Sequence, residues 1–379
     1  MKELIRYELL KITSKKSVRY TMVILFVILS VLMYRDVQGL SDEQLEGWEG
    51  KVDSEVVSQA KKEEQQLLFK LQDRVASKQD EVMLDTYRQI YETYEFKKTR
   101  ESKLTSLNEQ ISQHNREGEE NFTIRNLMLE RSLLSKVSAN TIYFDEPAEH
   151  MVDYMSTYGF ALLGVMILMG LSTIFTQEYE TGVHRLLLSS KDGRQKVAHA
   201  KLISSLIYVL GLLFSSISFA LLFYYLFLGH EGWNASLQSI PGFWDSPYPL
   251  ELSIYFWVKL LYHSVASVVF SLVVIMISSL CRSSVVSFSL SGSIFLFPLI
   301  ATKFALLQTD NKFFTSVFEV LTFSPSQIMR VDPLFIEYAA INIGGFPLLY
   351  PIFAFFILLL SASVPIFIIN KRSKYPSSI

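Results

Sequence analysis

The chain has 379 residues, of which 50% are hydrophobic and 19% are charged, and it carries a net charge of −2 and a single cysteine. Several uncharged apolar runs of about 20 residues exclude one water-soluble globule and indicate membrane spans. The lone Cys281 excludes a disulfide scaffold. Nucleic-acid binding is disfavoured because the large soluble block, residues 40–153, is acidic, with 24 of the 37 acids but 15 of the 35 bases.

The first 19 residues are predicted to form a helix on the cytoplasmic membrane surface. Leu4, Ile5, Leu9 and Ile12 recur at helical spacing, with lysines and arginines between them. Such a segment places its apolar face in the interface and its cations near anionic headgroups. We therefore expect residues 1–19 to be an interfacial, or elbow, helix. A basic segment that only sets the topology is the alternative.

Six apolar segments are predicted to cross the membrane. Each must be a helix, because hydrocarbon offers no water to a free backbone polar group. A cleaved signal peptide is the alternative for the first segment, but no small-x-small cleavage site follows its apolar run. The predicted spans are residues 20–39, 154–177, 202–229, 255–281, 283–303 and 347–370.

The basic residues of the short loops predict the orientation, since they gather on the cytoplasmic side. Lysines and arginines precede span one, fill the loop between spans two and three and follow span six, whereas the loop after span three has neither. Both termini, the loop 178–201 and the tail 371–379 are therefore expected to be cytoplasmic. Residues 40–153 and 308–346 are expected to be extracellular.

Residues 40–153 are predicted to be an extracellular α-helical domain inserted between spans one and two. Residues 41–115 contain no proline, and apolar side chains such as Tyr87 and Tyr91 recur at steps of three and four. A further helix is expected at 124–137. Two or three helices packed by these stripes would stand off the membrane. The acidic charge is either a solvated helical face or a surface that attracts a cationic ligand such as a peptide.

No motif in the chain carries enzyme chemistry. There is no phosphate-binding loop, no H-E-x-x-H and no cysteine pair, so we expect neither ATP hydrolysis nor a bound metal or cofactor on this chain. No Asp or Glu falls within the apolar runs of the predicted spans, the first of which is Tyr20–Tyr34. This disfavours a proton- or sodium-driven carrier. Lys259, His263 and Lys303 fall near the outer ends of spans and are expected to snorkel to the interface, with pore-mouth groups as the alternative.

The loop between spans two and three has a distinctive pattern: a Glu before a Gly, a leucine-rich turn, a Ser, an Arg and a Lys that opens the next span. The pattern resembles the cytoplasmic loop of type-2 ABC exporter permeases, the membrane subunits of bacterial ABC transporters. The N-terminal helix and the six spans in their in–out order extend the resemblance. Lys191, Asp192 and Gly193 replace the usual Pro and Ser, and many members have only a short loop in place of residues 40–153. The matching positions are Glu180, Gly182, Leu186, Leu187, Leu188, Ser189, Arg194 and Lys201.

The resemblance implies an all-α membrane protein whose coupling helix docks on a cytoplasmic ABC ATPase subunit. ATP and Mg²⁺ would be bound by that partner, and a second permease copy or a homologous permease would complete the pathway. Residues 308–346 would be an extracellular re-entrant region, and the location would be a bacterial plasma membrane. The residues assigned to ATPase coupling are Glu180, Gly182, Val183, Arg185, Leu186, Leu187, Ser189 and Arg194.

The predicted function is that of an exporter permease that moves an amphipathic substrate, such as a peptide, an antimicrobial or a lipid-like molecule, outward. Membrane lipid is a further expected partner. The acid-free spans favour such a cargo over a small ion. One alternative is a non-transporting ABC mechanotransmission or sensor protein, which typically has four spans. The other is a peptide receptor with an extracellular helical domain, which would need no coupling helix. The predicted pathway residues are Phe160, Leu163, Ile167, Phe288, Phe295 and Phe304.

Overall fold

A computed structural model describes most of the chain, and six helices in the described part are long and apolar enough to cross a membrane. The predicted fold class, an all-α protein with six spans, is confirmed. The described residues are 1–37, 48, 50–71, 76–116, 122–137, 141–142, 147–183, 193–230, 232–240, 242–305 and 320–374. The six spans are Lys16–Val37, Pro147–Glu180, Gly193–Leu228, Leu252–Leu280, Ser284–Thr302 and Tyr350–Ser373.

The secondary structure is helical apart from two short antiparallel ribbons within the described residues. The α-helices are α1 (Lys2–Thr13), α2 (Lys16–Val37), α4 (Ser54–Lys70), α5 (Lys78–Arg116), α6 (Phe122–Leu134), α7 (Pro147–Tyr154), α8 (Phe160–Leu171), α9 (Thr176–Glu180), α11 (Gly193–Leu228), α12 (Leu252–Leu280), α13 (Ser284–Ala305), α15 (Pro325–Ile328), α16 (Tyr350–Ser361) and α17 (Ser363–Lys374). The remaining elements are the π-helix η3 (Met155–Gly159), the 3₁₀ turns η4 (Leu237–Ser239) and η5 (Asp332–Leu334), and the strands β1 (Gly50–Lys51), β2 (Thr141–Ile142), β3 (Ala340–Ile343) and β4 (Phe346–Leu349).

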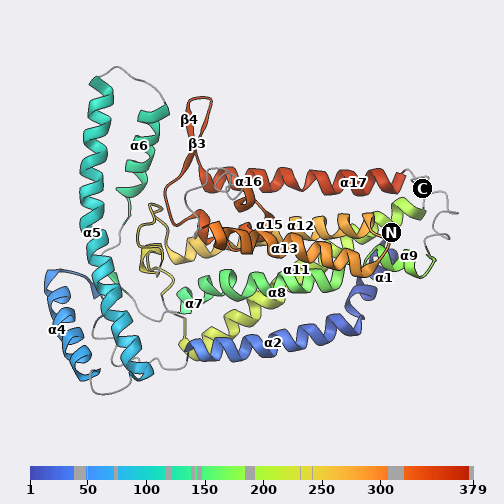
Figure 1. The fold of residues 1–379 in the computed structure, drawn as a ribbon, viewed down its shortest axis with the longest axis horizontal. Helices are drawn as coiled ribbons and strands as arrows, with labels where there is room; N and C mark the ends of the chain where they lie inside the picture. The colour runs from blue at the N-terminus through green and yellow to red at the C-terminus, as the bar shows by residue number, and fades with distance from the viewer. Residues whose placement is uncertain are drawn as a thin grey trace.

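The helical bundle has two distinct ends (Figure 1). Helix α1 and the end of α17 lie at one end, here called the terminal end. The block of helices α4, α5 and α6 stands at the opposite, distal end. An even number of spans returns the chain to the side on which it started, so both ends of the chain share one side.

Spans two and four form the centre of the bundle. The apolar windows of these spans are 67% and 56% buried, compared with 17%, 28% and 22% in spans one, five and six. Helix α12 packs against α7, α8, α11, α13, α16 and α17. Spans one, five and six therefore turn most of their apolar surface outward, where lipid or another apolar protein surface must cover it.

Helix α1 packs along α11 at the terminal end. Its Glu8 and Ile12 are buried, whereas Tyr7 and Leu10 on the other side are 64% and 53% exposed. The predicted amphipathic helix is therefore present, but the face that contains Ile12 lies against span three. Its exposed apolar residues are the ones left to meet the membrane surface or a partner.

Span two is not one regular helix. Helix α7 passes through the π-helix η3 into α8, and residues 172–175 form a turn before α9. The sequence predicts a continuous span at 154–177, but the helix begins at Pro147 and is interrupted near the terminal end. Breaks and π-turns of this kind concentrate at functional sites.

Short elements fill the described segment between spans five and six. Helix α15 and the turn η5 precede a hairpin of β3 and β4, in which Ala340 pairs with Leu349. Helix α16 begins at Tyr350, directly after β4, although span six is predicted to start at residue 347. At 320–349 the structure therefore has two single turns and a hairpin.

The distal block is held together by apolar side chains along α5. Val57 and Ala60 of α4 pack with Tyr87 and Ile90 of α5, and all four are buried. Helix α6 packs against the other half of α5, as Figure 1 shows. Asp53 caps α4 by accepting from two backbone N–H groups at 3.0 Å.

Spans two, four and five meet around one glycine. A Cβ atom at Gly164 of α8 would lie 2.2 Å from Cζ of Phe295 in α13, so only glycine leaves room for the ring. Phe295 is buried and its ring lies 5.1 Å from that of Phe270 in α12. Apolar packing without space for an extra methyl group therefore joins the three spans.

We predict that Gly164→Ala destabilises the protein by about 1–3 kcal/mol, because the Phe295 ring must move to admit the methyl group. Gly211→Ala in α11 is the matched control, since nothing lies within 4 Å of its added Cβ. Alanine is the better helix former, so the control should be neutral or stabilising. Thermal unfolding in detergent measures both, and equal midpoints for the two variants would contradict the close packing of Phe295.

Candidate coupling junction

The span-two junction, residues 170–180, lies where α8 gives way to α9 just before the predicted coupling loop. A turn inside a membrane helix needs partners for its backbone groups, because no water reaches them. The carbonyl oxygens of Gly170, Ser172 and Ile174 accept hydrogen bonds from side chains of other segments. The donors are Lys15 Nζ to Gly170 at 3.1 Å, Ser287 Oγ to Ser172 at 2.6 Å and Lys201 Nζ to Ile174 at 2.5 Å.

Two more contacts complete the attachment of this junction. Phe175 N donates to Ser278 Oγ at 3.0 Å, and Lys15 Nζ also donates to Thr173 Oγ1 at 2.7 Å. The side chains that hold the junction thus come from the turn before α2 and from α11, α12 and α13. A displacement of the junction must therefore move or release parts of spans one, three, four and five.

A buried ion pair lies at the centre of the junction. Lys201 Nζ is 2.5 Å from Glu178 Oε1, and the two side chains are 0% and 10% exposed. The same ammonium group lies 4.4 Å from the centre of the Phe175 ring. Removing one partner of a buried pair leaves an uncompensated charge, which costs far more than the pair itself contributes.

Two titratable groups of the N-terminal segment face the same region. Burial raises the pKa of the Glu8 carboxyl, an effect that the nearby cations Lys201 and Lys11 oppose. Burial, together with repulsion from Lys11 and Lys201, lowers the pKa of Lys15 to about 8. The Lys15 ammonium therefore stays largely protonated at pH 7 and keeps its donor role.

Glu180 fastens the end of the junction to the start of span five. Ser284 donates from its backbone N–H to Glu180 Oε1 at 2.7 Å and from its hydroxyl to Oε2 at 2.9 Å. A carboxylate at the first turn of a helix satisfies a free N–H group and suits the helix dipole. Among the residues predicted for ATPase coupling, Glu180 thus links the loop directly to α13.

The other predicted coupling residues divide into described and undescribed positions. Gly182 follows α9 with a φ of 75°, the left-handed conformation in which glycine ends helices. Val183 is 42% exposed, and Arg194 lies in the first turn of α11. The docking surface for an ATPase stays a prediction, because the rest fall outside the described residues: Arg185, Leu186, Leu187 and Ser189.

The predicted pathway residues lie mostly in packed surroundings in this one chain. Leu163, Ile167 and Phe295 are buried. Phe160 is half-buried, with its ring 6.4 Å from that of Phe295. Phe288 of α13 is 42% exposed. The side chains of Lys303 and Phe304 lie outside the described part of the chain.

Lys259 and His263 are fully buried, so the expectation that they snorkel is wrong. They lie about two and three turns inside α12. Lys259 Nζ is 2.5 Å from Asp332 Oδ1 and donates to the Val152 carbonyl at 2.6 Å. His263 Nδ1 lies 2.6 Å from the Met329 carbonyl oxygen. The segment after span five folds back into the bundle and supplies Asp332 and Met329, whereas Val152 belongs to span two.

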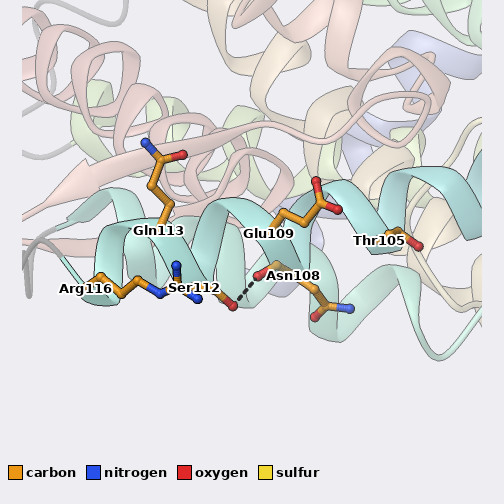
Figure 2. A pocket seen from close by; sticks show the side chains of 6 residues that line it. All are labelled: Thr105, Asn108, Glu109, Ser112, Gln113 and Arg116. Atoms are coloured by element: carbon orange, nitrogen blue, oxygen red, sulfur yellow. Dashed lines mark hydrogen bonds between the residues drawn. The ribbon is translucent and has the colours of Figure 1, made fainter.

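Two hollows lie away from this chemistry. One, of about 630 Å³, follows a polar face of α5 at the distal end (Figure 2). All six of its described lining residues are exposed and come from that one helix, unlike the convergent walls of a small-molecule site. The other, of about 420 Å³, lies beside the distal end of α11 and includes Tyr224, Tyr225 and Trp233. No predicted pathway residue is among the described lining of either hollow.

Sequence reasoning missed the residues that hold the junction and those around Lys259. Ser278, Ser284 and Ser287 read as ordinary polar residues near span ends, and nothing in their spacing marks them. A cation within an apolar helix was a usable signal, because a buried charge requires a partner. That signal pointed to Lys259 but did not identify Asp332 across 73 positions of sequence.

We predict that Lys201→Met costs about 3–5 kcal/mol of stability, because it leaves Glu178 buried without its cation. The double variant Lys201→Met/Glu178→Gln should recover a large part of the loss, since no net charge remains in the site. Thermal unfolding of the wild type, both single variants and the double variant gives the coupling energy. Strictly additive losses would rule out a buried pair at this position.

Comparison with known protein families identifies the family of the chain. A family model described as "ABC-2 family transporter protein" matches residues 7–368, which include the second half of α1, spans one to five and most of span six. A search of curated proteins gives no match. The resemblance seen in the loop is thereby confirmed on nearly the whole chain. The protein belongs to the ABC-2 family of transporter proteins and is a membrane permease component of an ABC transporter.

Proposed function

We propose that this chain is the permease subunit of an ABC exporter that moves an amphipathic substrate outward. The substrate class is a peptide, an antimicrobial or a lipid-like molecule, and the energy comes from ATP and Mg²⁺ bound on a separate nucleotide-binding subunit. The loop 181–192 receives that subunit. Both termini and this loop face the cytoplasm of a bacterial plasma membrane, and the block α4–α6 faces outward.

The observation that carries the proposal is the attachment of the span-two junction. The chain enters the loop through a segment that is bonded to Lys15, Lys201, Ser278 and Ser287. Glu180 adds a bond to the first turn of span five. A push on the loop would reach four other spans through these contacts, which is what a permease needs to convert the motion of an ATPase into movement of its helices.

The character of the spans supports an amphipathic cargo. The acids of the described spans lie within two turns of their ends, as Glu178 and Glu180 do at the terminal end of span two and Asp36 at the distal end of span one. The interior where spans two, four and five meet is aromatic and aliphatic, with Phe160, Phe270 and Phe295 as its rings. Such a lining suits an apolar or amphipathic molecule better than a hydrated ion.

The exposed apolar faces support pairing with a second permease, either another copy or a homologous chain. Along α2, Tyr20, Val23, Ile24, Val27 and Val31 form one outward stripe and are each at least half exposed. Helix α13 likewise exposes Val285 at 74% and Phe297 at 60%. Where spans two, four and five meet, the described interior is packed, so a route between two such outward faces would complete the transporter.

We predict that the protein, extracted in mild detergent with nucleotide present, recovers a soluble ATPase from its own cell lysate. The double variant Leu186→Asp/Leu187→Asp should lose that recovery about tenfold or more, because two carboxylates would have to enter an apolar groove on the ATPase. Quantitative mass spectrometry of the eluates gives the measurement.

The matched control is Leu68→Asp/Phe69→Asp in α4. These adjacent side chains are 48% and 73% exposed, so the control introduces the same charges at the same spacing at the distal end. It should keep the ATPase. If the wild type recovers no ATPase, the result contradicts the exporter proposal and favours a receptor that acts through the block α4–α6.

A further inference from the structure

The segment 325–335 enters the bundle at its distal end without forming a span. Its carbonyl groups and side chains are bonded to helices that do span. Gln327 Nε2 donates to the Pro298 carbonyl at 2.7 Å and to Thr302 Oγ1 at 2.6 Å, both on α13. Ser156 of η3 donates to the Arg330 carbonyl at 2.6 Å. Irregular backbone at this depth is tolerated only where protein or water satisfies it.

One buried ion pair holds the centre of this segment. Lys259 is fully buried in α12, and its nearest anion is Asp332, at 2.5 Å. Tyr255, one turn earlier on the same helix, donates to the same Asp332 oxygen at 2.7 Å. Asp153 of span two also attracts Lys259. The pair with Asp332 therefore fixes the segment to α12.

The segment sits directly over the apolar contact of spans two, four and five. The Arg330 guanidinium lies 5.7 Å from the centre of the Phe160 ring, which in turn neighbours Phe295. Val331 has a φ of 65°, a strained conformation for a β-branched residue. His263 Nε2 is buried without a hydrogen-bond partner among the described residues. A strained segment with an incompletely satisfied neighbour is held by a few strong contacts and not by regular structure.

The continuation of the segment is clamped to the distal block. Tyr338 OH donates to the carbonyl and side-chain oxygens of Asn126 in α6, at 3.1 and 2.8 Å. Arg125 of α6 donates to the Gly345 carbonyl at 3.0 Å and lies over the ring of Phe346, 4.4 Å from its centre. Helix α6 thus holds the β3–β4 hairpin that directly follows the segment in the chain.

We propose that residues 325–349 form a gate over the distal end of the route, that the Lys259–Asp332 pair holds this gate closed, and that the block α4–α6 controls it through the contacts of α6 with Tyr338 and the hairpin. Lys259 is a positioning residue in this scheme, because it acts on the gate and not on the cargo. The proposal of a gate rests on the proposed exporter function. The closed state of the gate, and its attachments through the Lys259–Asp332 pair and through α6, can be tested without measuring transport.

The test measures how fast a membrane-impermeant charged maleimide, added to intact cells, labels a cysteine placed in the gate. Cys281 is first replaced by serine, and Ser326→Cys then supplies a nearly isosteric reporter at a site that is 1% exposed. Asp332→Asn should raise its labelling rate about tenfold or more, the effect of losing a hydrogen-bonded charge. Arg125→Ala/Tyr338→Phe, which changes only the clamp, should raise the rate severalfold.

Two further reporters make the result interpretable. Ser135→Cys, at an exposed position in the turn directly after α6, must label rapidly in every background, which also tests the outward orientation of the block. Ser291→Cys, fully buried in α13 away from the gate, must stay protected.

Asp332→Asn could unfold the protein, which labelling at Ser291→Cys would reveal. In that case the milder variant Tyr255→Phe tests the gate, because it removes one hydroxyl and keeps the ion pair. It should raise the labelling rate at Ser326→Cys about threefold.

Each outcome separates the gate from the exporter proposal. If the labelling rate at Ser326→Cys is unchanged in both Asp332→Asn and Tyr255→Phe, the Lys259–Asp332 pair does not hold the gate closed. An unchanged rate in the clamp variant overturns control by the block. Absence of an ATPase partner, measured by the recovery experiment above, removes the exporter function but leaves these labelling rates unaffected.

Discussion

Inside a bilayer, a backbone carbonyl that leaves a regular helix finds no water, so side chains must serve it. Among the described residues, the backbone leaves the regular α-helix within the bundle at 172–175 and at 325–335, and side chains of neighbouring spans serve both segments. At the first, Lys15, Lys201 and Ser287 donate to the released carbonyls. At the second, Ser156 donates to the Arg330 carbonyl and Lys259 pairs with Asp332. The rest of the structure is arranged around these two polar sites.

Between the two polar sites the bundle is joined by apolar packing. Gly164 admits the Phe295 ring, and Phe270 and Phe160 surround it. Apolar contacts resist separation but lack direction, so helices can slide or rotate while keeping most of them. Polar contacts in a low-dielectric interior are directional and costly to break. The molecule therefore combines a deformable middle with two ends that hold defined positions, an arrangement suited to a protein that moves as helices pivot.

Membership of the ABC-2 family gives these features a purpose. The terminal-end junction leads into the loop proposed to receive an ATPase, and the distal segment lies on the opposite side, under the block α4–α6. A motion that begins at the loop would pass through the ion pair of Glu178 and Lys201 and through the cap that Glu180 places on α13. The ion pair of Lys259 and Asp332, which joins α12 to the turn η5, lies toward the distal end of the bundle.

The sequence by itself determined the six spans, the amphipathic N-terminal helix, the helical character of the inserted block and the family. These follow from hydropathy and periodicity, which are local properties that a linear chain displays directly. It also placed Glu180 and Gly182 in one loop pattern, and the resemblance to ABC permeases predicted that this loop couples to an ATPase.

Only the tertiary structure decided where span two breaks, that α1 lies on span three and that Lys259 is buried with Asp332. Each of these depends on groups far apart in the chain, and no local pattern states which distant side chain a released carbonyl or a buried charge will meet. The energy that fixes those pairings is the cost of leaving a polar group unsatisfied in hydrocarbon, and that cost is settled only when all six spans have assembled.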